Sequence, residues 1–352
     1  TLQAGCQSAH GMQASLMELL DVEAEKLHVI APDTGGGFGA RSPVYPEFIV
    51  TLIAARKLSR PVKWTSTRSE AFLTDYQARD HQFFGELALN NRGCFLGLRV
   101  RADWRHGAYL PGRCIWIMAQ YLSQILGGTY RIPTAHLYLR GIVTNTTPMA
   151  AYRGIGRLEA NYILERLIDQ AAHELGLDAV EIRRINLLRA EDLPWQTPGG
   201  ALITSGEFLA NLDTALAAVG WGDMSKRRNQ AMNHGRLYGV GLAMYAENDG
   251  STPTEFAEIA VSGDGRITAM VGTQDFGMGH STMYSQILSE KLGVNMETVF
   301  ADFERIVMPG ITHWQHPRFF AYFPANATPP SMLADYLITV IAPQCMLWQT
   351  SP

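Results

Sequence analysis

The chain has 352 residues, of which 47% are hydrophobic, and its formal net charge is −4. This length allows two domains, and the composition supplies a large apolar core, so an intrinsically disordered chain is excluded. The mild acidity argues against nucleic acid or an anionic membrane as the main partner, and no apolar run is long enough to span a bilayer.

The cysteines and the chain start indicate the cellular context. The four cysteines are scattered and include no C-x-x-C pair, so we expect free thiols and no iron–sulfur or zinc site inside this chain. No secretory leader is visible, and we expect a cytoplasmic protein. Because the sequence begins at Thr1 without a methionine, we expect it to be a piece of a longer protein.

The amino-terminal segment predicts alternating helices and strands. Residues 11–30 read as a helix that leads into a strand at Leu27–Ile30. Pro46 suits the first turn of a second helix, which ends at Ser59. A short strand is then expected over residues 61–66.

The middle of the sequence predicts a hairpin followed by two helices. Segments 83–89 and 94–104 have the pattern of two strands joined by a turn. Residues 158–175 repeat apolar side chains at helical spacing, and Gly176 is a typical residue at which such a helix ends. Asp178 then caps the next helix.

Later elements are separated by a stretch rich in Pro, Gly and Thr. Residues 191–206 read as a linker, and a helix is expected at 206–219. Segments 256–261 and 266–272 predict a second hairpin, and a helix follows over 281–292. Strands and helices do not alternate strictly, so the sequence favours an α+β fold.

Three glycine-rich loops each precede a predicted helix: Gly35–Gly39, Arg153–Arg157 and Gly277–His280. Glycine lets backbone N–H groups approach an anion closely, and a helix N-terminus favours negative charge. The three loops therefore predict a large anionic cofactor held at several points. Arg153 adds a guanidinium fork for phosphate, carboxylate or a metal oxo group, and His280 is expected to hydrogen-bond at the helix start.

Taken alone, the first loop fits a second interpretation. Gly35-x-Gly37-x-x-Ala40 lies between a strand and a helix, as in a dinucleotide-binding fingerprint. A nicotinamide-dependent dehydrogenase is thus an alternative. It needs an acidic residue closing the second strand, where Glu70 is a poor fit.

In their order and spacing, three motifs resemble one known family. Thr34–Gly39, Thr147–Gly154 and Gly272–His280 resemble the cofactor and active-site loops of the molybdopterin-binding subunit of the xanthine dehydrogenase, aldehyde oxidase and carbon monoxide dehydrogenase family. The resemblance covers about residues 1–298. It implies two mixed α/β molybdopterin-binding domains, the second truncated. We expect domains at 1–190 and 236–298, with a linker and connecting helix over 191–235.

The resemblance also implies roles for matched residues. Arg153 would lie beside the molybdenum, and Gln7 matches a family glutamine that contacts the metal centre. The cofactor-binding set would be Gly36, Gly37, Phe38, Gly39, Arg153, Gly154, Gln274, Gly277, Met278, Gly279 and His280. No side chain of the protein is expected to ligate a metal.

The complete enzyme is expected to have further parts. It would carry molybdopterin or molybdopterin cytosine dinucleotide. It would pass electrons to a 2Fe-2S iron–sulfur subunit and an FAD-binding subunit. It would oxidise a small aldehyde or N-heterocycle with oxygen drawn from water.

Departures from the family pattern limit the expected activity. Copper-containing carbon monoxide oxidisers have a cysteine after the loop arginine, where this chain has Gly154, so carbon monoxide oxidation is disfavoured. Met278 stands where a glutamine is common. The family's general-base glutamate belongs to a C-terminal segment beyond the resemblance, and Glu247 and Glu258 read as solvated side chains. We therefore expect this chain to be inactive as it stands.

The residues from 299 to 352 differ in composition from the rest. They are rich in aromatic side chains and proline and contain no lysine. Met308–Pro324 and Met346–Pro352 resemble the N-terminal part of a pyridoxal-phosphate-dependent aromatic-amino-acid decarboxylase, in which Trp314, Tyr322 and Phe323 would help line a substrate pocket. Without the Schiff-base lysine this segment cannot be a decarboxylase. A non-functional fusion of two gene pieces, or a non-catalytic interaction protein, therefore stays open beside the enzyme hypotheses.

Overall fold

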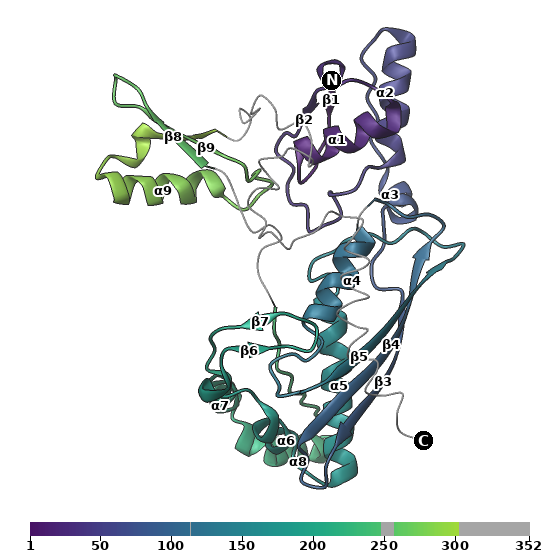
Figure 1. Cartoon of the computed structure of the whole chain (residues 1–352), viewed down its shortest axis with the longest axis vertical. Coiled ribbons are helices and arrows are strands. Elements are labelled where there is room, and N and C mark those ends of the chain that lie inside the picture. The colour runs from purple at the N-terminus through teal and green to yellow at the C-terminus, as the bar shows by residue number, and fades with distance from the viewer. Residues whose placement is uncertain (113, 248–256, 303–352) are drawn as a thin grey trace.

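A computed structural model gives the fold of residues 1–112, 114–247 and 257–302 (Figure 1). Helices and strands are mixed and the sheets are small, which confirms the α+β class. The expectations for Trp314, Tyr322 and Phe323 lie outside the described residues. No helix within the described ranges is long and apolar enough to cross a membrane.

The amino-terminal region packs two helices against a two-stranded parallel sheet. Strand β1 (Leu2–Gln3) pairs with β2 (Val29–Ile30). Helix α1 (Ala9–Leu20) lies between the two strands in the chain, and helix α2 (Pro46–Leu58) comes after β2. A small core forms from Leu2, Cys6, Met12, Leu16, Leu27 and Val29. The helix predicted from Pro46 to Ser59 is confirmed, with Ser59 in the left-handed conformation.

The strand predicted over residues 61–66 is wrong. This segment has no regular structure, because no described strand lies beside it to pair with its backbone groups. Helix α3 (Arg68–Thr74) follows instead. It begins with a capping box, in which Thr67 N–H donates to Glu70 Oε2 at 2.7 Å and Glu70 N–H donates to Thr67 Oγ1 at 3.2 Å.

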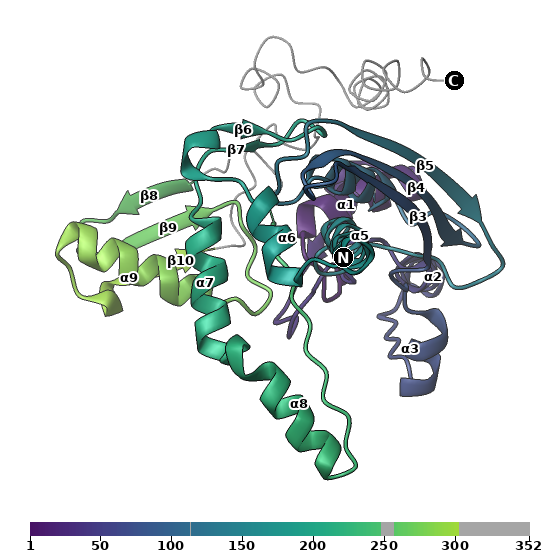
Figure 2. The ribbon, with the colours of Figure 1, turned by 90° about the horizontal axis from the view of Figure 1, so that it is seen from below.

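The largest sheet has three strands. The predicted hairpin is confirmed as β3 (His81–Leu89) and β4 (Phe95–Gly107), which pair antiparallel. Strand β5 (Ala135–Val143), absent from the sequence prediction, pairs parallel with β4. Figure 2 looks along helix α5 (Arg157–Leu175) and shows this sheet curving around one side of it.

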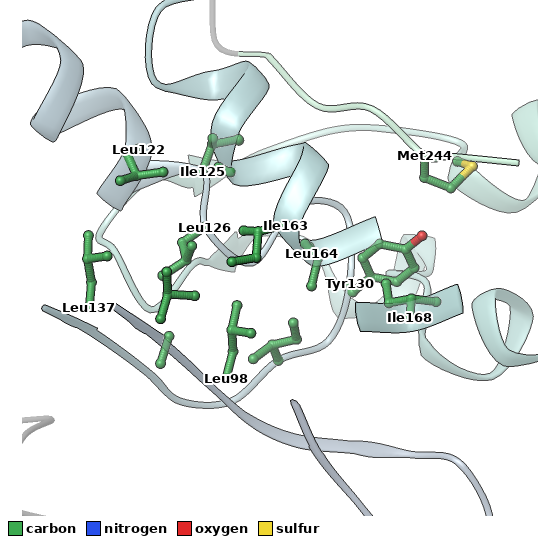
Figure 3. Packing of buried hydrophobic residues seen from close by; sticks show 14 of the residues in the cluster. Leu98, Leu122, Ile125, Leu126, Tyr130, Leu137, Ile163, Leu164, Ile168 and Met244 are labelled. Atoms are coloured by element: carbon green, nitrogen blue, oxygen red, sulfur yellow. The ribbon is translucent and has the colours of Figure 1, made fainter. Parts of the chain in front are cut away.

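Helices α4 (Cys114–Gln124) and α5 pack on the sheet to form the main core (Figure 3). The two helices approach closely because Gly156 precedes α5, where a Cβ atom would lie 2.4 Å from the Met118 carbonyl oxygen. Helix α5 ends at Gly176 in the left-handed conformation, as predicted. Helix α6 (Ala179–Asn186) is capped by Asp178, whose Oδ1 accepts from the amide of Val180.

A buried ionic cluster joins α5 and α6 beneath this core. The guanidinium of Arg183 donates to Glu165 at 2.7 Å and to Asp169 at 2.8 Å, and it has no solvent exposure. Burial raises the pKa of the Glu165 carboxyl against the opposing effect of Arg183. Arg183 also donates to the carbonyl of Leu242, which ties the strand-free segment 236–247 to the helices.

The segment predicted as a linker carries local structure of its own. It holds the 3₁₀ turn Ala190–Asp192 and the small hairpin of β6 (Trp195–Gln196) and β7 (Leu202–Ile203). Helix α7 (Phe208–Val219) confirms the helix predicted at 206–219. The turn Trp221–Asp223 and helix α8 (Met224–Asn233) complete the connection.

The last described unit is a small sheet covered by a helix. Strands β8 (Ala257–Val261) and β9 (Ile267–Val271) form the predicted hairpin, and helix α9 (His280–Leu292) follows. After the turn Met296–Thr298, strand β10 (Val299–Asp302) pairs parallel with β9. The first residues after Thr298 therefore complete this sheet. Figure 1 shows the unit beside the amino-terminal region and away from the large sheet.

Candidate functional site

The first and second glycine loops are joined through their backbones. The amide of Arg153 donates to the carbonyl of Phe38 at 2.9 Å. At Gly39, where φ is +93°, a Cβ atom would lie 2.7 Å from the carbonyl oxygen of Ala151. Two segments more than a hundred positions apart in the sequence therefore touch, and glycine is needed at the contact.

The first loop also meets the third loop. The amide of Gly36 donates to the carbonyl of Phe276 at 2.8 Å. Gly277 faces it with φ at +122°, and a Cβ atom there would lie 3.4 Å from the nitrogen of Gly36. Phe38, Arg153 and the third loop thus belong to one region, as the hypothesis of a shared ligand requires.

Gln274 fixes the third loop to the start of α1. Its Oε1 accepts from the amide of Ala9 at 2.8 Å, and its Nε2 donates to the carbonyl of Cys6 at 2.7 Å. Both polar ends of the Gln274 side chain are therefore used to join the two parts of the chain. The structure gives this predicted cofactor residue an architectural role.

The side chain of Gln7 accepts hydrogen bonds from the first loop. Its Oε1 accepts from the amide of Gly39 at 2.7 Å and from the amide of Arg41 at 3.3 Å. Gly37 leaves room for this side chain, since a Cβ atom at position 37 would lie 2.4 Å from Cδ of Gln7. The predicted pair Gln7 and Gly37 is thus brought together.

The amides of the third loop already have an anionic partner. Asp275 Oδ1 accepts from Gly277 at 2.8 Å and from Met278 at 3.0 Å, and its Oδ2 accepts from His280 at 2.8 Å. These backbone donors hold the pKa of the Asp275 carboxyl below its usual range. A carboxylate of the chain thus occupies the start of α9, where the sequence predicts a contact with an anionic cofactor.

An open cleft lies beside the second loop. Its volume is about 670 Å³. It is lined by Arg79, Tyr152, Arg153, Gly154, Leu158, Tyr245 and Glu247. Arg153 is an exposed cation at this cleft.

Glu247 has contacts that the sequence interpretation did not predict. It is exposed, as expected of a solvated side chain, and it also lines the cleft, where its Oε1 lies 3.4 Å from Nη1 of the buried Arg157. Tyr245 donates to its Oε2, and burial followed by this contact raises the pKa of Tyr245 to about 12. The amide group of Asn161 holds the adjacent Ala246 on α5. Nothing in the sequence reveals this placement, because it depends on the path of the segment after α8.

Metal-ligating side chains do not gather at this site. Within the described part of the chain, no group of three or more His, Cys, Asp or Glu residues has the arrangement of a metal site. The groups that meet here are backbone amides bonded within the chain, the Gln7 side chain, which accepts from the amide of Gly39, and the exposed guanidinium of Arg153. That guanidinium suits an anionic group.

Comparison with known families identifies three matching regions. Residues 1–187 match a molybdopterin cofactor-binding domain, and residues 214–304 match a second one. Residues 286–352 match the pyridoxal-dependent decarboxylase conserved domain. Both resemblances drawn from the sequence are confirmed.

Two relatives in sequence and one solved structure are similar to this chain. The chain is 34% identical over 310 residues to the 6-hydroxypseudooxynicotine dehydrogenase complex subunit gamma of Paenarthrobacter nicotinovorans, which covers 86% of this chain and 38% of that protein. It is 34% identical over 309 residues to the carbon monoxide dehydrogenase large chain of Hydrogenophaga pseudoflava, covering 83% and 38%. Quinoline 2-oxidoreductase from Pseudomonas putida 86 has a TM-score of 0.79 at 28% identity, covering 85% of this chain and 40% of that one. The chain thus spans about 40% of the length of these relatives.

Proposed function

The chain belongs to the family of molybdopterin-dependent oxidoreductases, and from this membership we propose that its three glycine loops hold one molybdenum–pterin cofactor. The observation that carries the proposal is the convergence of the loops through the bonds from Gly36 to Phe276 and from Arg153 to Phe38. Gly37 and Gly39 support this convergence, because a Cβ atom at either position would overlap Gln7 or Ala151, so glycine is what lets the first loop pack against both.

The residues of the site have distinct roles in this proposal. Gly36, Gly37, Phe38 and Gly39 form one wall of the cradle, and Gln7 orders that wall through the amide of Gly39. Gln274, Gly277, Met278, Gly279 and His280 form the opposite wall. Arg153 and Gly154 face the open cleft, where the guanidinium neutralises negative charge on the ligand. When bound, the cofactor would supply two-electron oxidation with transfer of oxygen from water.

We extend the proposal to the complete enzyme. It hydroxylates an aldehyde or an N-heterocycle in the cytoplasm. Its cofactor is molybdopterin or its cytosine dinucleotide, and its electrons pass to subunits that carry 2Fe-2S clusters and FAD. Gly154, in place of a cysteine, disfavours carbon monoxide oxidation. This chain alone is inactive, since the family's general base lies outside the segment that it matches.

The proposed domain division is the one expected from the sequence, and its bounds differ from those of the matching regions, 1–187, 214–304 and 286–352. The first domain covers residues 1–190, the connection 191–235 and the second domain 236–298, with the decarboxylase-like segment from 299 onward. The pairing of β10 with β9 supports a second domain that reaches Asp302.

The nicotinamide alternative has less support from the geometry. Glu70, the acidic residue considered for this alternative, caps helix α3, where its Oε2 accepts from the amide of Thr67 at 2.7 Å. It is not placed at the end of a strand for a dinucleotide.

Cofactor analysis tests the proposal. The chain is expressed with molybdenum cofactor supply, purified by size exclusion, and analysed for molybdenum and pterin. We expect both in the wild type and a marked loss in Arg153→Ala. The matched control is Arg228→Ala on α8, an exposed arginine far from the loops in sequence. Wild-type protein that melts cooperatively yet carries neither molybdenum nor pterin contradicts the proposal.

A further inference from the structure

One guanidinium outside the predicted site holds the second loop by two contacts. Nη2 of Arg79 donates to the main-chain carbonyl of Arg153. Its Cζ lies 5.7 Å from the ring centroid of Tyr152, within the range of a cation–π contact. Arg79 therefore contacts two consecutive residues of the loop, and it lines the same cleft as Arg153.

The backbone at Arg79 is held in an unusual conformation. Its φ is +71°, in the left-handed region that residues other than glycine, asparagine and aspartate seldom adopt. Such a conformation persists where the surroundings impose it, and it clusters at functional sites.

The buried carboxylate of Glu159 lies beside the Arg79 guanidinium. Oε1 of Glu159 lies 4.0 Å from Nε of Arg79 and 3.2 Å from Nε2 of His81. The side chains of Glu159 and His81 are only 6% and 2% exposed. Burial works to raise the pKa of the Glu159 carboxyl, but the neighbouring His81 ring and the Arg79 charge outweigh it and keep that pKa below its usual range.

The support continues into the sheet. His81 is on β3 and stacks on Trp104 of β4, with ring centroids 4.9 Å apart. Glu159 lies in the first turn of α5, where the helix dipole favours a negative charge. A continuous series of contacts thus runs from the rigid sheet through His81, Glu159 and Arg79 to the carbonyl of Arg153.

We propose that Arg79 is a positioning residue which sets the main chain of the second loop, and through it the Arg153 side chain in the cleft, while Glu159 holds Arg79 in place. The link to cofactor binding rests on the function proposed above. The effect of Arg79 on the main chain of the second loop does not depend on that function, because it concerns the chain without ligand. The planar fork of arginine is needed, since lysine cannot make the carbonyl bond and the flat ring contact together.

Hydrogen exchange of the ligand-free full chain tests this inference. The reporting amides are Arg153, bonded to the Phe38 carbonyl, and Ile155, bonded to the Tyr152 carbonyl. In Arg79→Lys we expect both amides to exchange about tenfold faster or more, the effect of losing one charge-assisted hydrogen bond. Glu159→Gln keeps the shape of the side chain but removes its charge. It should accelerate the exchange of both amides by a smaller factor.

Two references separate positioning from general loss of structure. Amides within α5 should keep their wild-type protection in both variants. Arg184→Lys, which alters the exposed ion pair with Asp213, should leave the loop unchanged. If Arg79→Lys does not melt cooperatively, Glu159→Gln alone decides. Wild-type exchange at the loop, or equal acceleration of the loop and of α5, overturns the inference whether or not the chain takes up cofactor.

Discussion

The contact between Gly39 and the second loop gives the sharpest quantitative prediction. In Gly39→Ala the new methyl group would lie 2.7 Å from the oxygen and 2.9 Å from the carbonyl carbon of Ala151, and 3.0 Å from Cα of Tyr152. All three neighbours are backbone atoms, so no side-chain rotation relieves the overlap. The loops must separate, which removes the bond from Arg153 to Phe38.

The expected cost has two parts. Alanine at a φ of +93° is strained by about 1–3 kcal/mol. Losing one backbone hydrogen bond adds about 1 kcal/mol. We therefore expect Gly39→Ala to lower the free energy of unfolding by about 2–4 kcal/mol, measured by urea denaturation, and to abolish retention of molybdenum.

A second glycine serves as the matched control. Gly222 lies in the turn after α7, and a Cβ atom there would meet nothing within 4 Å. Gly222→Ala should change the free energy of unfolding by less than about 0.5 kcal/mol. If Gly39→Ala costs no more than Gly222→Ala, the loops do not make the contact described and the reasoning is refuted.

Three further changes probe other contacts. Arg183→Ala leaves the buried Glu165 unpaired and should cost about 3–5 kcal/mol of unfolding free energy in urea, and an unchanged midpoint would refute this. Gln7→Ala strips the amide of Gly39 of its acceptor and should reduce molybdenum content more than it lowers the melting temperature, and full retention of molybdenum would oppose it. Because the folded-state pKa of Asp275 is depressed, its support of the α9 start is present above the usual aspartate range and is lost as pH falls through the folded pKa. An NMR titration of this carboxyl at or above its ordinary value, or Asp275→Asn without fraying at α9, would argue against that bonding pattern.

Some of the fold follows directly from local pattern. The periodicity of residues 158–175 predicts α5, because that helix buries one apolar stripe on the sheet. The turn between β3 and β4, and the caps Gly176 and Asp178, are equally local. The strand at 61–66 fails for the opposite reason: pairing depends on a neighbouring strand, which local composition does not reveal.

The residues of the candidate site also fall into those that the sequence reveals and those that it does not. The glycine loops are visible in sequence because their residue types are fixed by close backbone approach, as at Gly39. Arg79 and Glu247 carry no such mark, since an arginine or a glutamate is ordinary on any surface. Their importance appears only when β3 and the segment after α8 are placed beside the second loop.

A crystal structure of the chain expressed with molybdenum cofactor supply, with anomalous scattering recorded at the molybdenum edge, would show whether the three loops share one ligand. We expect one molybdenum peak beside Arg153. We also expect continuous density for an organic ligand that touches Gly36–Gly39 and the third loop together. Molybdenum bound elsewhere, or a ligand that contacts one loop alone, would contradict this expectation.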